Sequence, residues 1–173
     1  MRVHKNATFS IVGSGESYPS LQKLVNDLGI SAAVTFHGRV SEKEKAQLLS
    51  QSWAALQPSH MEGWGITVIE ANAAGTPVIA SNVNGLQDSV VDGETGLLVP
   101  AGDVAHFAIA MKKIVEDDML RMNLSEAALR WSRNFDWEQS ADDFYRLIGR
   151  NFGQGALRHV YSKVIFSAAD RKN

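Results

Sequence analysis

The chain has 173 residues, of which 45% are apolar, a formal net charge of −2 and no cysteine. This length and composition predict one compact domain with a buried core, and the near-neutral charge argues against a nucleic-acid-binding or membrane-surface role. Without cysteine the chain forms neither a disulfide nor a thiolate metal site, which fits the reducing cytoplasm. Neither a signal peptide nor an apolar run long enough to span a bilayer is visible.

Over residues 7–117, short apolar runs rich in β-branched residues alternate with helical patterns, which is typical of an α/β fold. A capping box of Ser41 and Glu44 marks the start of one helix, and Gly29 marks the end of another. In chain order, the expected elements are a strand at 7–12, a helix at 18–28, a strand at 33–37, a helix at 41–51, a strand at 53–57, a helix at 66–74 and strands at 78–80 and 96–99.

The expected architecture is a Rossmann-like, doubly wound parallel sheet, because strands joined by helices pair in parallel through right-handed crossovers. Ligands of such sheets bind at the carboxyl ends of the strands. Beyond the last strand the pattern predicts helices only, at 103–115, at 118–131 and from about residue 137. We expect residues 1–150 to form this domain and assign no role to the tail, residues 151–173.

The stretch HMEGWGITVIEANAAG, residues 60–75, has the composition of an anion site. The helix after Gly65 should begin at the ligand edge of the sheet, so the first-turn amides of Ile66, Thr67 and Val68 have no partners within the helix. The helix dipole adds roughly half a positive charge there. Gly63 and Gly65 let an anion approach the backbone, and the sequence therefore predicts a phosphate at this point.

Two glutamates, Glu62 and Glu70, bracket this predicted phosphate. Glu70 lies one turn into the helix, where its carboxylate can accept two hydrogen bonds from a ribose diol attached to the same phosphate. Glu62 precedes the helix, so its partner should be the group that the phosphate carries on its other side. Trp64, between them, is expected to pack the loop rather than to stack on a sugar.

The same stretch resembles the E-x7-E signature of the retaining, two-domain glycosyltransferases of group 1, which have the GT-B fold. The resemblance extends from residue 7 to about residue 148, and the whole chain would be the carboxyl-terminal, donor-binding half of such an enzyme. The matching residues are Gly13, Gly15, 34–40, Pro58, Ser59, Glu62, Gly63, Trp64, Gly65, Glu70, Ala71, Gly75, Pro77, Val78, 92–98, Phe135 and Trp137.

This resemblance implies a donor site for a UDP-, GDP- or ADP-sugar. Glu62 would be the catalytic residue, because it would hold the hydroxyls of the transferred sugar beside the reaction centre, and Glu70 would bind the ribose. Backbone groups of Arg39 and Val40 would contact the base. The other donor-site residues that we expect are Gly63, Gly65, Ile66, Thr67, Gly13 and Gly15.

The implied reaction is transfer of a hexosyl group with retention, in polysaccharide or glycolipid biosynthesis. Preorganised donors would stabilise the leaving diphosphate, and the resemblance implies no metal or cofactor. None of the five histidines shows a metal-ligand spacing. The implied partners are the nucleotide sugar and an N-terminal acceptor-binding domain, through which the full enzyme would reach a membrane-associated acceptor at the inner membrane face.

Two departures from the family pattern stand out. The first strand of the family domain, with its diphosphate-neutralising Arg and Lys, has no counterpart ahead of the strand at 7–12, and the acceptor-binding domain is absent. We therefore expect the chain to be inactive or weakly active alone. The loop from Asn84 to Asp88, which lies near the phosphates in relatives, replaces a common Gly-Gly-Glu pattern.

Other interpretations remain open at this stage. The chain could be a nucleotide-sugar-binding module or a subunit that needs a separate N-terminal partner. A two-lobed nucleotide-sugar epimerase is less favoured, and a glycoside hydrolase least, because its two carboxylates must flank a sugar bond. The segment Gly13-Ser14-Gly15 begins like a dinucleotide fingerprint, but Tyr18 occupies the position of the third glycine. It forms either a tight turn or a wall of the donor cleft.

Overall fold

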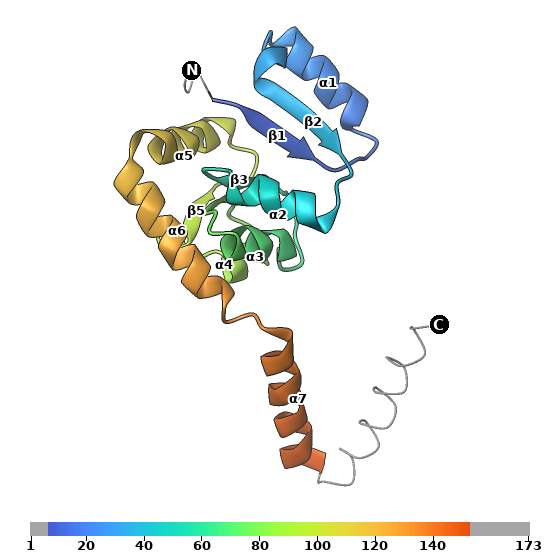
Figure 1. The fold of residues 1–173 in the computed structure, drawn as a ribbon, viewed down its shortest axis with the longest axis vertical. Coiled ribbons are helices and arrows are strands. Elements are labelled where there is room, and N and C mark those ends of the chain that lie inside the picture. The colour runs from blue at the N-terminus through green and yellow to red at the C-terminus, as the bar shows by residue number, and fades with distance from the viewer. Residues whose placement is uncertain (1–6, 153–173) are drawn as a thin grey trace. The chain divides into compact units, whose positions relative to one another are not determined.

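The structure is a computed structural model that describes residues 7–152 (Figure 1). It divides into two compact units, one up to Arg133 and one from Asn134 onward. The predicted tail, from residue 153 onward, lies outside the described residues. Within residues 7–152, no helix has the length and apolar character needed to cross a membrane.

The order of elements follows the predicted alternation of strands and helices. The strands are β1 (Phe9–Val12), β2 (Val34–Gly38), β3 (Ala55–Gln57), β4 (Val78–Ser81) and β5 (Gly96–Val99). The helices are α1 (Tyr18–Asp27), α2 (Glu42–Ser50), α3 (Ile66–Ala73), α4 (Leu86–Ser89), α5 (Val104–Glu116), α6 (Asp118–Ser132) and α7 (Trp137–Phe152), with a 3-10 turn at Ser31–Ala33. The short helix α4 was not predicted from the sequence.

All strand pairs are parallel, as predicted, but the strands form two sheets rather than one. One sheet pairs β1 with β2, and the other has the order β3-β4-β5. The α/β class with parallel pairing and C-terminal helices is therefore confirmed. The expected continuous sheet is not found, because no described strand pairs with the second edge of β1 or of β3.

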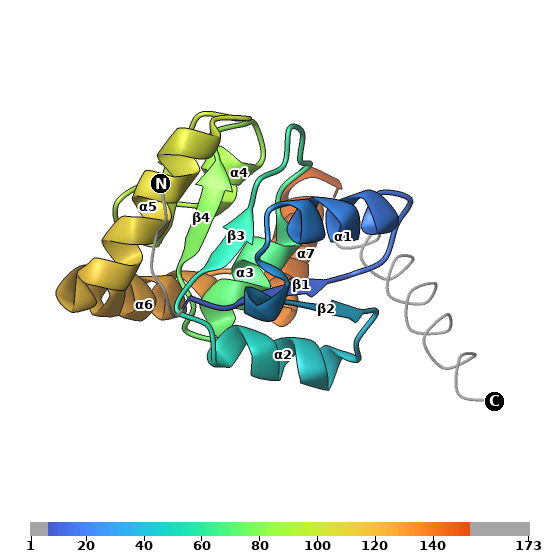
Figure 2. The same ribbon diagram turned by 90° about the horizontal axis from the view of Figure 1, so that it is seen from above.

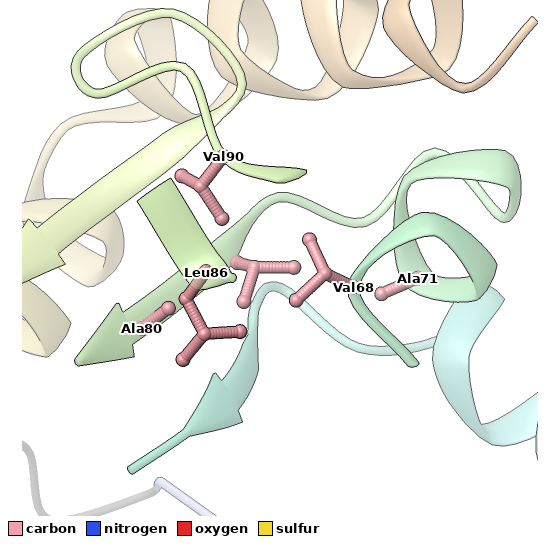
Figure 3. Close-up of a cluster of buried hydrophobic side chains, with 6 residues drawn as sticks. Val68, Ala71, Ala80, Leu86 and Val90 are labelled. Carbon is pink, nitrogen blue, oxygen red and sulfur yellow. The ribbon is translucent and has the colours of Figure 1, made fainter. Parts of the chain in front are cut away.

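The core lies on the two faces of β4, whose four residues are all buried. Alternate side chains of a strand point to opposite faces, so Val78 and Ala80 join one cluster and Ile79 joins the other. The first cluster adds Val68, Ala71, Leu86 and Val90, from α3, α4 and the residue after α4 (Figure 3). The second adds Val99, Ala110, Ile114 and Leu124, from β5, α5 and α6. Helices α3 and α5 thus cover opposite faces of the sheet (Figure 2).

The second unit contains α7 in its described part. Asp136 precedes this helix, and its Oδ1 accepts hydrogen bonds from the backbone amides of Glu138 and Gln139 at 2.7 and 3.1 Å. An Asp side-chain oxygen that accepts hydrogen bonds from first-turn amides is a usual N-terminal cap of a helix. Two aromatic residues of the helix, Trp137 and Phe144, are exposed.

Replacement of Leu124 by alanine should lower the free energy of unfolding by about 2–5 kcal/mol, because the side chain is 1% exposed and its removal leaves a cavity. Leu129→Ala in the same helix is the matched control. Leu129 is 38% exposed, so its truncation should cost less than about 1 kcal/mol. Urea unfolding of both variants measures the difference, and equal losses would contradict the assigned core.

The N-terminus of α5 should make stability depend on pH. The pKa of Asp103 is held below its ordinary value, first by the hydrogen bond from the backbone amide of His106 and then by the His106 ring. Because the folded-state pKa is lowered, the carboxylate stabilises the fold at neutral pH, and this contribution is lost as pH falls through that pKa.

The variant Asp103→Asn keeps an acceptor for the cap but removes the charge. Its deficit in unfolding free energy relative to the parent chain should be present at pH 7 and should shrink toward zero in acid. Urea midpoints across a pH series measure this deficit. Asp142→Asn, at an exposed position of α7, controls for the change in net charge. A deficit that is independent of pH would show that the cap does not depend on ionisation.

Candidate functional site

The carboxylate of Glu62 is held at the carboxyl end of β3. Gln57, the last residue of that strand, donates from Nε2 to Glu62 Oε2 at 3.2 Å, and the Ser59 hydroxyl donates to the same oxygen at 3.4 Å. The backbone amide of Gly63 donates to the other oxygen at 3.3 Å. The carboxylate is therefore oriented by its own loop and strand before any ligand binds.

Helix α3 begins at this edge of the sheet, directly after Gly65. Gly65 is its N-cap residue, with φ of 83°. A side chain at Gly65 would place its Cβ 2.8 Å from Leu86 Cδ2 in the core, so glycine is required both for the backbone and for the close packing. Thr67 is exposed, and its hydroxyl donates to Gln57 Oε1 at 3.2 Å. Gln57 thus connects the start of α3 with Glu62.

One part of the predicted phosphate site needs correction. The amide of Val68 was expected to be free, but it donates to the Gly65 carbonyl at 2.9 Å and closes a tight first turn. The structure gives no hydrogen bond for the amides of Ile66 and Thr67 among the described residues, so these two are the donors available to an anion. The surface here is open, because Ile66 is 61% and Met61 89% exposed.

Glu70 lies one turn further along α3 and contacts a lysine from α2. Lys45 Nζ donates to Glu70 Oε1 at 2.9 Å and forms a second ion pair with Glu42 at 2.8 Å. These two carboxylates raise the pKa of Lys45, the contact with Glu42 having the larger effect. The second oxygen of Glu70, Oε2, is buried and has no hydrogen-bond partner among the described residues.

Arg39 and the first glycine turn form a separate group, at the ends of β1 and β2. Arg39 Nε donates to the Ser14 hydroxyl at 2.9 Å, and the amide of Gly13 donates to the Gly38 carbonyl at 2.7 Å. Gly13 has φ of 124°, which a side chain would strain, and the turn that follows is closed by the hydrogen bond from the Tyr18 amide to the Gly15 carbonyl at 3.1 Å. Val40, next to Arg39, is half-buried.

The structure therefore gathers the predicted residues into two groups. Glu62, Gly63, Gly65, Ile66, Thr67 and Glu70 surround the N-terminal half of α3, whereas Arg39, Val40, Gly13 and Gly15 lie at the β1–β2 sheet. Helix α2 follows Val40 in the chain, and its Lys45 contacts Glu70 of the first group.

Three further residues contribute to the site, and of these only Gly85 lies in a segment that the sequence had indicated. The sequence pattern places Lys45 on a solvent-exposed helix face and Gln57 at the end of a strand, and neither position indicates a role in the site. Gly85, in the loop after β4, lies against the glutamate loop, since a Cβ there would be 2.4 Å from the Glu62 carbonyl oxygen. The loop at 84–88 therefore lies beside the loop that carries Glu62. The contacts of Lys45, Gln57 and Gly85 join different segments of the chain. Of the three residues, only the loop glycine could therefore be recognised from the sequence.

Comparison with known proteins identifies the family. The family described as "Glycosyl transferases group 1" matches residues 1–131. This chain belongs to that family. The predicted resemblance to the carboxyl-terminal half of the GT-B fold is therefore confirmed.

Curated relatives share more than a third of their aligned residues with this chain. The D-inositol 3-phosphate glycosyltransferase of Rhodococcus opacus (strain B4) is 39% identical over 149 residues, which are 83% of this chain and 33% of the relative. A glycogen synthase of Mycobacterium tuberculosis is 34% identical over 141 residues, 81% of this chain and 34% of the relative. The chain thus spans about a third of the length of the curated relatives it matches.

Two solved structures have the same fold over most of this chain. The sucrose-phosphate synthase from Thermosynechococcus elongatus matches with a TM-score of 0.75 and 33% identity, over 83% of this chain and 38% of that one. The Anabaena protein HepE, in complex with UDP and glucose, matches with a TM-score of 0.77 over 83% of this chain and 40% of that one. Its identity is 22%, so this likeness concerns the fold.

Gly85 should be the least replaceable glycine of the site. Gly85→Ala places a methyl group against the backbone of Glu62 and Gly63 and should cost about 1–3 kcal/mol beyond the cost of positive φ. Gly93→Ala is the matched control, because Gly93 has φ of 76° but nothing within 4 Å of its Cβ position. Urea midpoints and the amide shifts of residues 62–63 should change far more in the first variant. Equal effects would show that the two loops do not touch.

Proposed function

We propose that this chain forms the donor-binding half of a retaining glycosyltransferase, which transfers a hexosyl group from a nucleoside diphosphate sugar to an acceptor. One observation supports this function above the others. Glu62 and Glu70 stand on either side of the free amides at the start of α3, at the carboxyl end of a parallel sheet. A carboxylate, two amides and a second carboxylate match, in order, a sugar, a phosphate and a ribose.

The roles of the individual groups follow from their chemistry. The amides of Ile66 and Thr67 would hold the distal phosphate and stabilise the charge that develops on it as the sugar leaves. Glu62 would accept hydrogen bonds from sugar hydroxyls beside the reaction centre. Its two oxygens already have donors in Gln57, Ser59 and Gly63, which keep the carboxylate in place for that contact.

Glu70 would bind the ribose together with Lys45. Lys45 already donates to Glu70 Oε1, so a ribose hydroxyl bound there would share the carboxylate with an ammonium group. That pairing would keep the glutamate side chain oriented. Arg39 and Val40 would contact the base through their backbone groups, and the turn at Gly13 to Gly15 would line the same side of the donor.

The wider reaction needs more polypeptide than these 173 residues. The chain spans about a third of its curated relatives, so the acceptor site and the partner domain are proposed from the family. In this proposal an N-terminal acceptor-binding domain completes the enzyme in the cytoplasm, and the full protein approaches a membrane-associated acceptor. The chain alone should turn over little or no substrate.

A nucleotide-sugar-binding subunit without its own activity is the second candidate function, favoured by the same coverage of a third of the relatives. Addition of a separately produced N-terminal domain would distinguish the two. Restored transfer to an acceptor supports the transferase, whereas tight nucleotide-sugar binding without any transfer supports the subunit. Product that is isomerised without an acceptor would instead point to an epimerase.

Nucleotide binding tests the site first. Titration calorimetry with UDP, GDP and ADP should show saturable binding of one nucleotide, and UDP is the first choice because the HepE structure contains it. Glu70→Gln should weaken that binding about 10-fold or more, because a hydrogen bond to a charged group contributes about 1.5–3 kcal/mol. Glu126→Gln removes an equal charge on α6 and should leave binding unchanged. Equal nucleotide affinity of the two variants would show that Glu70 does not contact the nucleotide.

Glu62 should separate sugar binding from nucleotide binding. In Glu62→Gln, affinity for the free nucleoside diphosphate should stay within about twofold, whereas the preference for its glucose or mannose conjugate should fall about tenfold. The same calorimetric titrations measure both quantities. If the diphosphate and the conjugates lose affinity equally, Glu62 does not contact the sugar.

A further inference from the structure

The carboxylate of Glu70 does not offer both of its oxygens to a ligand in this structure. Oε1 already accepts from Lys45 Nζ at 2.9 Å, and Oε2 is buried without a hydrogen-bond partner among the described residues. A carboxylate holds a diol with both oxygens only when the ligand can reach both. The expectation that Glu70 alone accepts hydrogen bonds from two ribose hydroxyls therefore does not fit this arrangement, because the second hydroxyl would lack an acceptor.

Lys45 is the group beside Glu70 that has a further hydrogen bond to give. An ammonium group carries three N–H donors, and the described contacts of Nζ use two of them, to Glu70 at 2.9 Å and to Glu42 at 2.8 Å. The Lys45 side chain is 27% exposed, so a ligand can approach it. An acceptor on Glu70 and a donor on Lys45 thus lie next to each other.

The core of the domain fixes the position of Lys45. Leu49 lies one turn further along the same face of α2 and packs against the buried cluster on the α3 side of β4. The hydroxyl of Thr76, which follows α3, donates to the Leu49 carbonyl at 2.6 Å. Helix α2 is therefore held against α3 (Figure 1), and the contact of Lys45 with Glu70 is a result of this packing.

The two helices that supply this pair are the ones that begin at the other proposed nucleotide contacts. In the proposed function, the base contacts directly precede α2 and the phosphate-binding amides open α3. Lys45 lies one turn into α2, and Glu70 lies one turn into α3. Their contact therefore joins the base-binding helix to the phosphate-binding helix. In a nucleotide, the group that joins the base to the phosphate is the ribose.

We propose that Lys45 is a specificity-determining residue of the donor site, which donates a hydrogen bond to one hydroxyl of the ribose while Glu70 Oε1 accepts one from the other. The ribose would thus be held by a donor and an acceptor from two helices rather than by one carboxylate. This inference rests on the proposed function and adds a requirement to it. Both the 2′ and the 3′ hydroxyl must be present, because each is bound by a different protein group.

A phosphate is the other ligand that a lysine could bind, and the local charges argue against it. Glu42, Lys45 and Glu70 together carry one net negative charge. The two carboxylates, first Glu42 and then Glu70, raise the pKa of the Lys45 ammonium. The positive charge of Lys45 is thus already balanced by its neighbours, so this cluster favours a neutral hydroxyl group over an anion.

The test measures how strongly each ribose hydroxyl contributes to binding. Titration calorimetry compares UDP, the nucleotide in the HepE structure, with 2′-deoxy-UDP and 3′-deoxy-UDP. The unaltered chain should bind each deoxy nucleotide about tenfold more weakly than UDP, because each lacks one hydrogen bond to a charged group. Lys45→Met should bind UDP more weakly and lose this penalty for one deoxy nucleotide only. The penalty for the other, whose missing hydroxyl would contact Glu70, should remain.

Lys43→Met is the matched control. Lys43 lies in the same helix, and its side chain is exposed, so this variant should keep both penalties. Each penalty is a ratio of affinities measured on one protein, so a general change in stability does not produce the expected result. If Lys45→Met does not fold, NMR of the unaltered chain decides instead. The Lys45 Cε signal should shift on binding of UDP and shift much less with one of the two deoxy nucleotides.

Two results would overturn this inference while leaving the proposed function intact. One is saturable binding of UDP with both penalties unchanged in Lys45→Met, which would make Lys45 a phosphate contact or a purely structural residue. The other is the lack of a penalty for either deoxy nucleotide in the unaltered chain. If UDP does not bind, GDP and ADP with their deoxy forms replace it, and failure of all three nucleotides would overturn the proposed function together with this inference.

Discussion

Burial of β4 on both faces is the constraint on which the rest of the described structure depends. Its apolar side chains alternate between two clusters, so one helix layer must pack on each side. Helix α3 meets this requirement through Val68 and Ala71, and its axis is thereby set against the strand. Because α3 follows β3 directly in a parallel sheet, its N-terminus must lie at the carboxyl ends of the strands. The position of the proposed anion site is thus a consequence of how the core is packed.

The charged and polar groups at that edge are balanced by individual contacts rather than by an overall positive potential of the protein. The chain has a net charge of only −2, so an anionic ligand must be attracted by particular donors. Gln57 is central here, since its amide donates to Glu62 and its carbonyl accepts from Thr67. On the other side, Lys45 balances both Glu42 and Glu70. The site is therefore preorganised by contacts between a strand end, a loop and two helices.

The N-terminal segment, residues 9–38, forms regular strands and a helix but has no buried core of its own. Its strands pair with each other and its helix has an apolar face, yet no side chain of residues 9–38 is buried. The hydrophobic effect stabilises a layer only when apolar area is removed from water. Both sheets nevertheless belong to one compact unit, which extends to Arg133, and the contact of Lys45 in α2 with Glu70 in α3 lies between them along the chain.

The sequence by itself determined the α/β class, the order of the strands and helices, and the family, because periodicity, capping residues and glycine stops are local properties of the chain. It also located Glu62, Gly65 and Glu70, since their spacing along α3 and its preceding loop is fixed by the helix. Only the tertiary structure decided that the strands divide into two sheets, that Lys45 reaches Glu70 and that Gly85 supports the Glu62 loop. These features depend on which segments meet in space, and contacts between residues 25 or more positions apart leave little trace in the sequence of either partner.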